Sequence, residues 1–142
     1  GGSPRKGKQL VDKFMANLPA YARLKEVVLQ SMRKRGTLRG LDGRRLRVES
    51  EHSALNFLLQ SAGAIVMKKA LVLLKHSLDE SGVWYKFVAN VHDEWQIESS
   101  SSDADLVGRL GVQAIVDAGL HFEMNCPLDG DYNVGLTWAD TH

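Results

Sequence analysis

Two runs of β-forming residues that meet at three titratable side chains constrain the fold of this chain more than any other feature. Residues 83–91 form the first run, His92, Asp93 and Glu94 follow it, and residues 95–98 alternate apolar and polar side chains. This pattern predicts a β-hairpin with the three side chains at or near its turn. Neighbouring side chains on a flat strand point to opposite faces, so adjacent carboxylates can approach one cation only where the chain bends.

The hairpin turn is a candidate metal site. Carboxylate oxygens suit Mg²⁺, which retains several waters and takes one or two protein carboxylates beside substrate phosphates. Asp93 and Glu94 are therefore candidate metal ligands. The alternative is an ordinary solvated turn.

Length and composition indicate a globular domain. The chain has 142 residues, of which 44% are hydrophobic and 25% charged, and it is long enough to bury a core. We find no apolar run as long as a membrane span and no signal-peptide core after the charged start, and we expect no membrane contact. Cys126 is the only cysteine and cannot form an internal disulfide, so we expect a reducing, cytoplasmic setting.

The net charge of +1 conceals a strong asymmetry along the sequence. Residues 1–50 contain thirteen Lys or Arg and four Asp or Glu, a balance of +9, whereas residues 51–142 contain five and thirteen, a balance of −8. Such a distribution fits a protein in which one part binds a polyanion and another gathers cations. The alternative is that the two halves of the sequence are not halves in space.

The basic half begins with predicted helices and a predicted ribbon. Apolar side chains recur at helical spacing after Pro4 and again after Pro19, and Gly36 is expected to end the second helix. Asp42-Gly43 between short β-prone runs predicts a hairpin over residues 37–48. The ribbon carries Arg39, Arg44, Arg45 and Arg47. Guanidinium groups at this density suit phosphate contact, although a solubilising edge strand would look the same.

Residues 49–78 show the longest helical pattern and predict a mostly buried helix. His52, Asn56 and Gln60 recur every four residues and are expected to lie along one side of it. Asn and Gln amides can donate to the acceptors that every base pair shows in the minor groove, so they can test pair geometry without reading sequence. A polar stripe facing solvent is the alternative.

The last third of the sequence predicts a helix followed by extended structure. Asp103 is a plausible N-cap for a helix that ends near Gly119, and residues 120–138 read as extended structure broken by Pro127 and a turn at Asp129-Gly130. The predicted fold class is α+β. An antiparallel sheet, made of the hairpin and a C-terminal strand, packs on helices, with an N-terminal helical pair and a small Arg-rich ribbon.

Several separated stretches resemble, in one order, the C-terminal part of a family A DNA polymerase of the kind found in tailed bacteriophages. The stretches are Gly40-Leu41-Asp42-Gly43-Arg44-Arg45, then Ala54-Leu55-Asn56 and residues 59–64, then Val91-His92-Asp93-Glu94, and finally Trp138 to the terminal His142. The resemblance implies that residues 1–36 lead from the fingers and that residues 37–142 form the palm subdomain.

The resemblance also implies roles for single residues. Asp93 would be a catalytic carboxylate that binds two Mg²⁺ ions, Glu94 would be the second carboxylate that supports the metal site, and His92 would contact the primer strand near its 3′ end. The DNA-binding residues would be Arg39, Arg44, Arg45, His52, Asn56, Gln60 and His92, with Asn56 and Gln60 at the minor groove and Arg44 and Arg45 on the duplex backbone.

Two family motifs have no counterpart in the sequence. The family's second catalytic aspartate and its nucleotide-binding fingers helix both precede the stretches found here. We therefore expect the isolated chain to be inactive and to need an N-terminal polymerase part, as an expression fragment or as half of a split polymerase. That part would also bind the incoming dNTP that extends the primer-template DNA. If the chain is phage-encoded, we expect this to take place in the bacterial host cytoplasm.

Other interpretations remain open. The isolated chain could form a homo-oligomer through the sheet edge that the missing strand leaves unpaired. From a different class, the chain could be a non-catalytic duplex-DNA-binding module. A small Mg²⁺-dependent hydrolase is the weakest alternative, because the sequence shows few other clustered acids.

Overall fold

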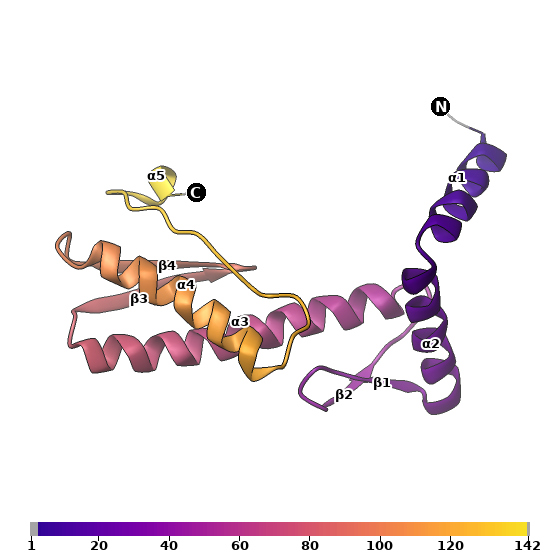
Figure 1. Cartoon of the computed structure of the whole chain (residues 1–142), viewed down its shortest axis with the longest axis horizontal. Helices are drawn as coiled ribbons and strands as arrows, with labels where there is room; N and C mark the ends of the chain where they lie inside the picture. Colours follow the sequence, from indigo (N-terminus) through magenta and orange to yellow (C-terminus); the bar gives the residue numbers. More distant parts are fainter. Residues whose placement is uncertain (1–2, 142) are drawn as a thin grey trace. The chain divides into compact units, whose positions relative to one another are not determined.

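The computed structural model describes residues 3–141 and confirms an α+β fold. Helices combine with two separate two-stranded antiparallel sheets (Figure 1). The chain divides into two compact units, residues 1–60 and residues 61–142, and helix α3 (Ala54–Ser81) contributes to both. Each unit is described separately below.

The predicted N-terminal helices are present in the first unit. Helix α1 spans Pro4–Asn17 and α2 spans Pro19–Arg35. Each begins with proline, whose fixed φ and missing N–H suit the first helical position. Gly36 has a φ of 67° and its N–H bonds to the Met32 carbonyl, so a left-handed glycine ends α2 as expected.

The predicted arginine ribbon is also present. Strand β1 (Thr37–Arg39) pairs antiparallel with β2 (Arg45–Arg47), and Gly43 has the positive φ of 83° that the tight turn needs. Leu38 and Leu46 face each other on the buried side of the ribbon. The core of this unit consists of Val28, Leu38, Leu46, Val48, Ala54 and Leu55.

Helix α3 begins at Ala54, five residues later than the sequence suggests. The hydroxyl groups of Ser50 and Ser53 lie 2.8 Å apart, and the Ser53 N–H donates to Ser50 Oγ, so these side chains stabilise a turn in place of the first helical turn. His52 therefore precedes the helix. Its expected place on the helical side with Asn56 and Gln60 is wrong.

Helix α3 also departs from two expectations about burial and membranes. An 18-residue window of it has a mean hydropathy of 1.6, which is apolar enough to cross a bilayer, yet only 22% of that window is buried. The prediction of a mostly buried helix and the statement that no apolar run reaches the length of a span are both wrong. Lys68 and Lys69 lie within the helix, and a charged side chain at the centre of a bilayer costs roughly 2.5–3.5 kcal/mol. These lysines favour a helix of a water-exposed protein.

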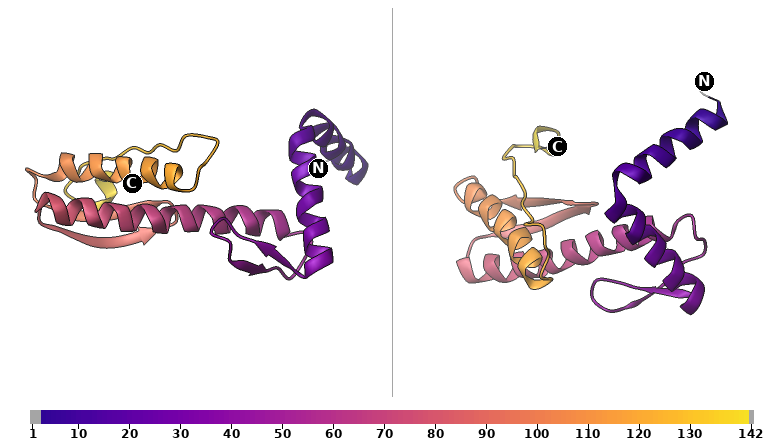
Figure 2. Two further views of the ribbon diagram at one scale, coloured as in Figure 1. Left: turned by 60° about the horizontal axis from the view of Figure 1, so that its bottom comes forward. Right: turned by 45° about the vertical axis from the view of Figure 1, so that its right-hand side comes forward.

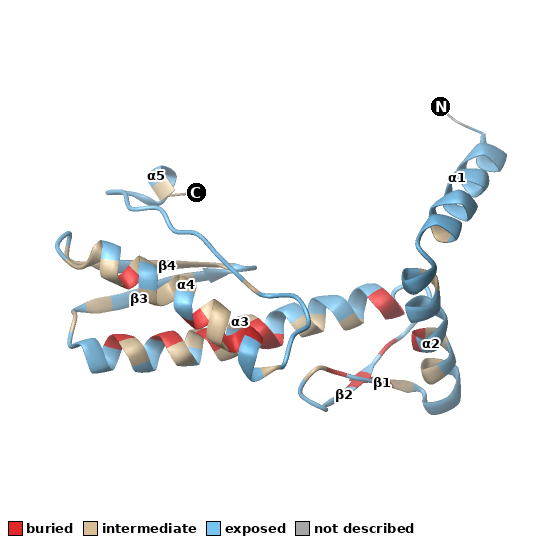
Figure 3. Ribbon diagram, viewed as in Figure 1, coloured by how far each residue is buried: buried red, intermediate tan, exposed pale blue. Residues whose placement is uncertain are grey.

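The second unit contains the predicted central hairpin. Strand β3 (Tyr85–Val91) pairs antiparallel with β4 (Glu94–Ser99), with an irregularity between Phe87 and Ala89. Helix α4 (Ala104–His121) and α3 supply the buried core residues Leu74, Leu78, Val107 and Ala114 (Figure 3). Asp103 precedes α4, but its carboxylate accepts from Ser100 Oγ at 2.5 Å and makes no capping bond, so its predicted capping role is wrong.

The predicted C-terminal strand is wrong. Within the described part of the chain, residues 122–137 form no strand, and they lead to the short helix α5 (Trp138–Thr141). Pro127 has no N–H to donate to a sheet, and glycines of α4 hold the segment instead, since a Cβ on Gly108 would overlap the Tyr132 ring and one on Gly119 would lie 2.9 Å from Leu128 Cγ. The C-terminal segment (residues 122–141) therefore returns along α4 (Figure 2). His142 lies outside the described residues.

Candidate active-site hairpin and arginine ribbon

The hairpin turn bends the chain as the candidate site requires. His92 has a left-handed φ of 54°, which is uncommon for a residue other than glycine, and Val91 pairs with Glu94 across the turn. His92 and Asp93 are exposed, and Glu94 at the start of β4 is half-buried. The three candidate residues therefore lie together at one end of the sheet.

The two carboxylates at the turn have different environments. Glu94 Oε1 accepts from the Trp138 indole N–H at 3.2 Å and from the side-chain amide of Gln96. Asp93 is exposed to solvent. Glu94 is thus held by the C-terminal segment, and Asp93 is the more accessible of the two carboxylates.

The donor set matches part of a magnesium site. Among residues 3–141, no three His, Cys, Asp or Glu side chains are arranged to hold a metal ion. Mg²⁺ nevertheless takes only one or two protein carboxylates when substrate phosphates and water complete its shell. Asp93, with Glu94 beside it, supplies that number.

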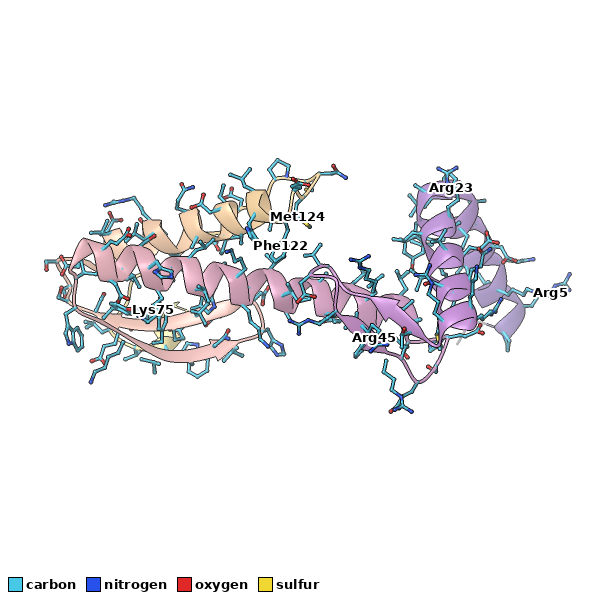
Figure 4. The ribbon with its side chains drawn as sticks, turned by 90° about the horizontal axis from the view of Figure 1, so that it is seen from below. Arg5, Arg23, Arg45, Lys75, Phe122 and Met124 are labelled. Atoms are coloured by element: carbon cyan, nitrogen blue, oxygen red, sulfur yellow. The ribbon has the colours of Figure 1, made fainter. Side chains whose placement is uncertain are left out.

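The arginine ribbon presents one strongly basic face. Leu38 and Leu46 face the core, so Arg39 and Arg45, which are paired across the ribbon, lie together on the opposite, exposed face (Figure 4 labels Arg45). Arg47 lies two residues further along β2 and shares that face. Like charges directly opposite each other are destabilising, and a bound polyanion would relieve this repulsion.

Arg44 differs from its neighbours because it is already paired. Its Nε lies 2.7 Å and its Nη2 2.6 Å from Asp42 Oδ2, and its backbone N–H donates to Asp42 Oδ1. The hydrogen bond from the Arg44 side chain lowers the pKa of Asp42, which keeps the carboxylate ionised. Arg44 thus stabilises the turn, and Arg39, Arg45 and Arg47 form the ribbon's exposed basic face.

Two of the three polar candidates near the start of α3 lie on the helix, and the third lies in the turn before it. Asn56 and Gln60 are exposed and lie one turn apart on α3, and His52 is exposed in the preceding turn. A hollow of about 440 Å³ in the first unit brings His52 and Asn56 together with Tyr21 and Lys25, without Gln60. Tyr21 and Lys25 were not among the candidates, because the helical spacing of α2 carries no information about which side chains border α3.

Sequence reasoning also missed Trp138 and Gln96. Gln96 belongs to the alternating pattern of β4, and Trp138 belongs to a stretch that resembles the polymerase family, but neither pattern indicates contact with Glu94. Trp138 is 44 residues away from Glu94 in sequence.

The fold is that of a polymerase domain. The structure resembles the POL domain of Pol1 from M. smegmatis, solved in complex with DNA primer-template and dNTP, with a TM-score of 0.75. The match covers 82% of this chain and 23% of that chain at 21% sequence identity, so it supports the fold alone.

The model of DNA polymerase family A matches residues 6–140, and the chain therefore belongs to that family. The DNA-directed DNA polymerases of Enterobacteria phage T3 and Escherichia phage T7 are 33% and 34% identical to it over the whole chain. DNA polymerase I of Bacillus caldotenax is 29% identical over 92% of the chain. The chain spans 23% of the length of each phage polymerase and 15% of that of the Bacillus enzyme. These relatives confirm the resemblance seen in the sequence.

Proposed function

We propose that this chain is the C-terminal palm part of a DNA-directed DNA polymerase. The observation that carries the proposal is the hairpin turn, which exposes Asp93 and holds Glu94 beside it in a chain of DNA polymerase family A. The division into residues 1–36 from the fingers and residues 37–142 from the palm belongs to the same proposal.

In the proposed reaction, Asp93 holds Mg²⁺ and Glu94 supports the site. Two such ions, when bound, would supply the Lewis acidity for attack by the primer 3′-hydroxyl and for departure of pyrophosphate. Asp93 needs a partner carboxylate, which we assign to an N-terminal part of the polymerase together with the helix that binds the incoming dNTP. His92, exposed beside Asp93, would contact the primer strand near its 3′ end.

The first unit would bind the primer-template duplex. Arg39, Arg45 and Arg47 would neutralise backbone phosphates, because guanidinium groups fork onto phosphate oxygens and release counterions. Asn56 and Gln60 would donate to minor-groove acceptors, which are present at every base pair. His52 shares the hollow with Asn56 and is assigned to the same DNA-binding side. Arg44 is assigned a lesser role, since Asp42 already neutralises it.

The second unit would associate with the missing part through its sheet. The β3–β4 sheet has two strands, and Val88 is 66% exposed on β3. Unpaired strand edges and exposed apolar side chains favour association. The isolated chain would therefore form homo-oligomers or bind its N-terminal counterpart. Without that counterpart it would be inactive. The proposed setting is the reducing cytoplasm.

The test is complementation. The chain is mixed with an N-terminal fragment from a related polymerase that carries the other catalytic aspartate, and nucleotide addition to a primer-template is followed. We expect templated addition in the mixture and in neither part alone. Asp93→Ala should abolish addition and leave duplex binding intact, because Asp93 belongs to a different unit from the arginine ribbon.

A non-catalytic duplex-DNA-binding module is the second candidate. The basic face of the ribbon favours it. Under this alternative, complementation never yields nucleotide addition, while duplex binding still depends on Arg45.

A further inference from the structure

Helix α5 is fixed at its start by its own side chains. Thr137 N–H and Thr137 Oγ1 both donate to Asp140 Oδ2, at 2.9 and 2.8 Å, so the third helical residue reaches back to the residue before the helix. These hydrogen bonds lower the pKa of Asp140, which therefore stays ionised and remains a strong acceptor. A four-residue helix is held in shape by this arrangement.

The far end of α5 is tied to strand β4. Thr141 Oγ1 lies 3.1 Å from Gln96 Oε1 and 3.1 Å from the Trp138 carbonyl oxygen. Gln96 receives a hydrogen bond through its carbonyl oxygen and therefore directs its amide nitrogen, a donor, toward Glu94. The contact with Thr141 agrees with this orientation of Gln96, which the acceptor-only Glu94 carboxylate also requires.

Trp138 adds a second donor to the same oxygen. Its indole nitrogen can only donate, and it lies 3.2 Å from Glu94 Oε1. Two donors on one carboxylate oxygen restrict the rotation of the side chain. Glu94 Oε1 is consequently held by Gln96 of β4 and Trp138 of α5, whereas the adjacent Asp93 is exposed.

We propose that Trp138 is a positioning residue, whose indole N–H orients Glu94 so that Glu94 stabilises a cation held by Asp93. The proposal rests on the proposed polymerase function. Partners that orient the groups around a metal ion change metal affinity or activity by about 10–100-fold when they are removed. The ring of Trp138 is half-exposed, so the N–H, more than the packing of the ring, should carry the effect.

The first experiment tests the contact without polymerase activity. The 142-residue chain, labelled with ¹⁵N at its three tryptophans, gives one indole N–H signal for each. Glu94→Gln should shift the Trp138 signal and leave that of Trp84 unchanged. Trp84 directly precedes β3, at the end of the hairpin that is away from the turn. A Trp138 signal that is identical in the wild type and Glu94→Gln would overturn the proposal.

The second experiment tests the consequence for the metal. In the complemented polymerase, Trp138→Phe keeps an aromatic ring and removes the N–H. We expect the Mg²⁺ concentration at half-maximal activity to rise about tenfold, with the Kd for duplex DNA unchanged. Trp84→Phe is the matched control and should behave as the wild type.

The two experiments separate the failure of this inference from the failure of the proposed function. If the wild-type mixture adds nucleotides and Trp138→Phe has the wild-type Mg²⁺ dependence, the positioning role is wrong and the polymerase assignment stands. If the wild-type mixture adds none, the proposed function fails, and with it this role of Trp138.

Discussion

The two hairpins of the chain expose opposite charges at their turns. At each turn, one charged residue is bonded to another side chain and its neighbour is exposed. In the ribbon, Arg44 is bonded to Asp42 inside the turn, while Arg45 next to it is exposed. In the central hairpin, Glu94 is bonded to Trp138, while Asp93 next to it is exposed. In both places one of two adjacent charged residues stabilises the structure and leaves its neighbour accessible. Charged residues that are adjacent in sequence therefore differ in whether they are bonded within the turn region or exposed to solvent.

The largest expected difference between two such neighbours is at the central hairpin. Glu94→Gln in the complemented polymerase should lower nucleotide addition about 10–100-fold, because the amide keeps the size of the side chain and loses its charge. Asp93→Asn should lower it by on the order of 10³-fold or more, or about 4 kcal/mol of transition-state stabilisation. Single-turnover kinetics at saturating dNTP measure both. Equal losses for the two variants would contradict the division of roles.

The same comparison in the ribbon concerns DNA binding. Arg45→Ala should weaken binding evenly across duplex sequences and reduce the slope of log K against log [salt] by about 1. Arg44→Ala should change that slope much less, since Asp42 already neutralises Arg44. Fluorescence anisotropy at several salt concentrations provides the slopes. A larger change for Arg44→Ala would show that the Asp42 pair opens when DNA binds.

Two glycines of α4 test how the C-terminal segment packs in the second unit. Gly108→Ala should destabilise it by roughly 1–3 kcal/mol, because the added methyl group overlaps the Tyr132 ring. Gly111→Ala is the matched control, as open space surrounds Gly111, and it should be neutral or stabilising by up to about 1 kcal/mol. Urea denaturation measures both, and the Trp138 indole signal should move in Gly108→Ala alone. Equal stabilities would mean that Tyr132 is not held against Gly108.

The smallest expected effect concerns the ion pair between Arg33 and Glu51, whose atoms approach to 2.6 Å. The hydrogen bond from Arg33 lowers the pKa of Glu51 below its ordinary 4.5. A lowered folded-state pKa gives stability that is present above the unfolded pKa and is lost as the pH falls through the folded one. The difference in urea midpoint between the wild type and Glu51→Gln should therefore be small at pH 7 and shrink as the pH falls below 4.5. A difference that grows in acid would contradict this sign.

Local sequence patterns predicted those parts of the fold that depend on residues close together in the chain. Pro19 and Gly36 set the limits of α2, and Asp42-Gly43 and His92-Asp93 form the two turns, because each depends on φ preferences within a few residues. The α+β class and the positions of both hairpins follow from these signals.

The errors arise where distant residues or competing local bonds decide the structure. The C-terminal segment is held by Tyr132, which donates to Asp105 27 residues away, and by Trp138, which donates to Glu94 44 residues away. No periodicity reports such contacts. The start of α3 was misplaced because Ser50 and Ser53 form a turn that the apolar pattern does not register.

The proposed function requires the turn at Asp93 to be the cation-binding part of this chain. Its most direct test is the broadening of backbone amide NMR signals by Mn²⁺, which replaces Mg²⁺ at oxygen sites, in the wild type and in Asp93→Asn. We predict that the amides of residues 92–94 broaden first in the wild type and that Asp93→Asn removes this preference. Earlier broadening at another acidic site, such as Asp103 and Asp105, or an unchanged pattern in Asp93→Asn, would contradict the account.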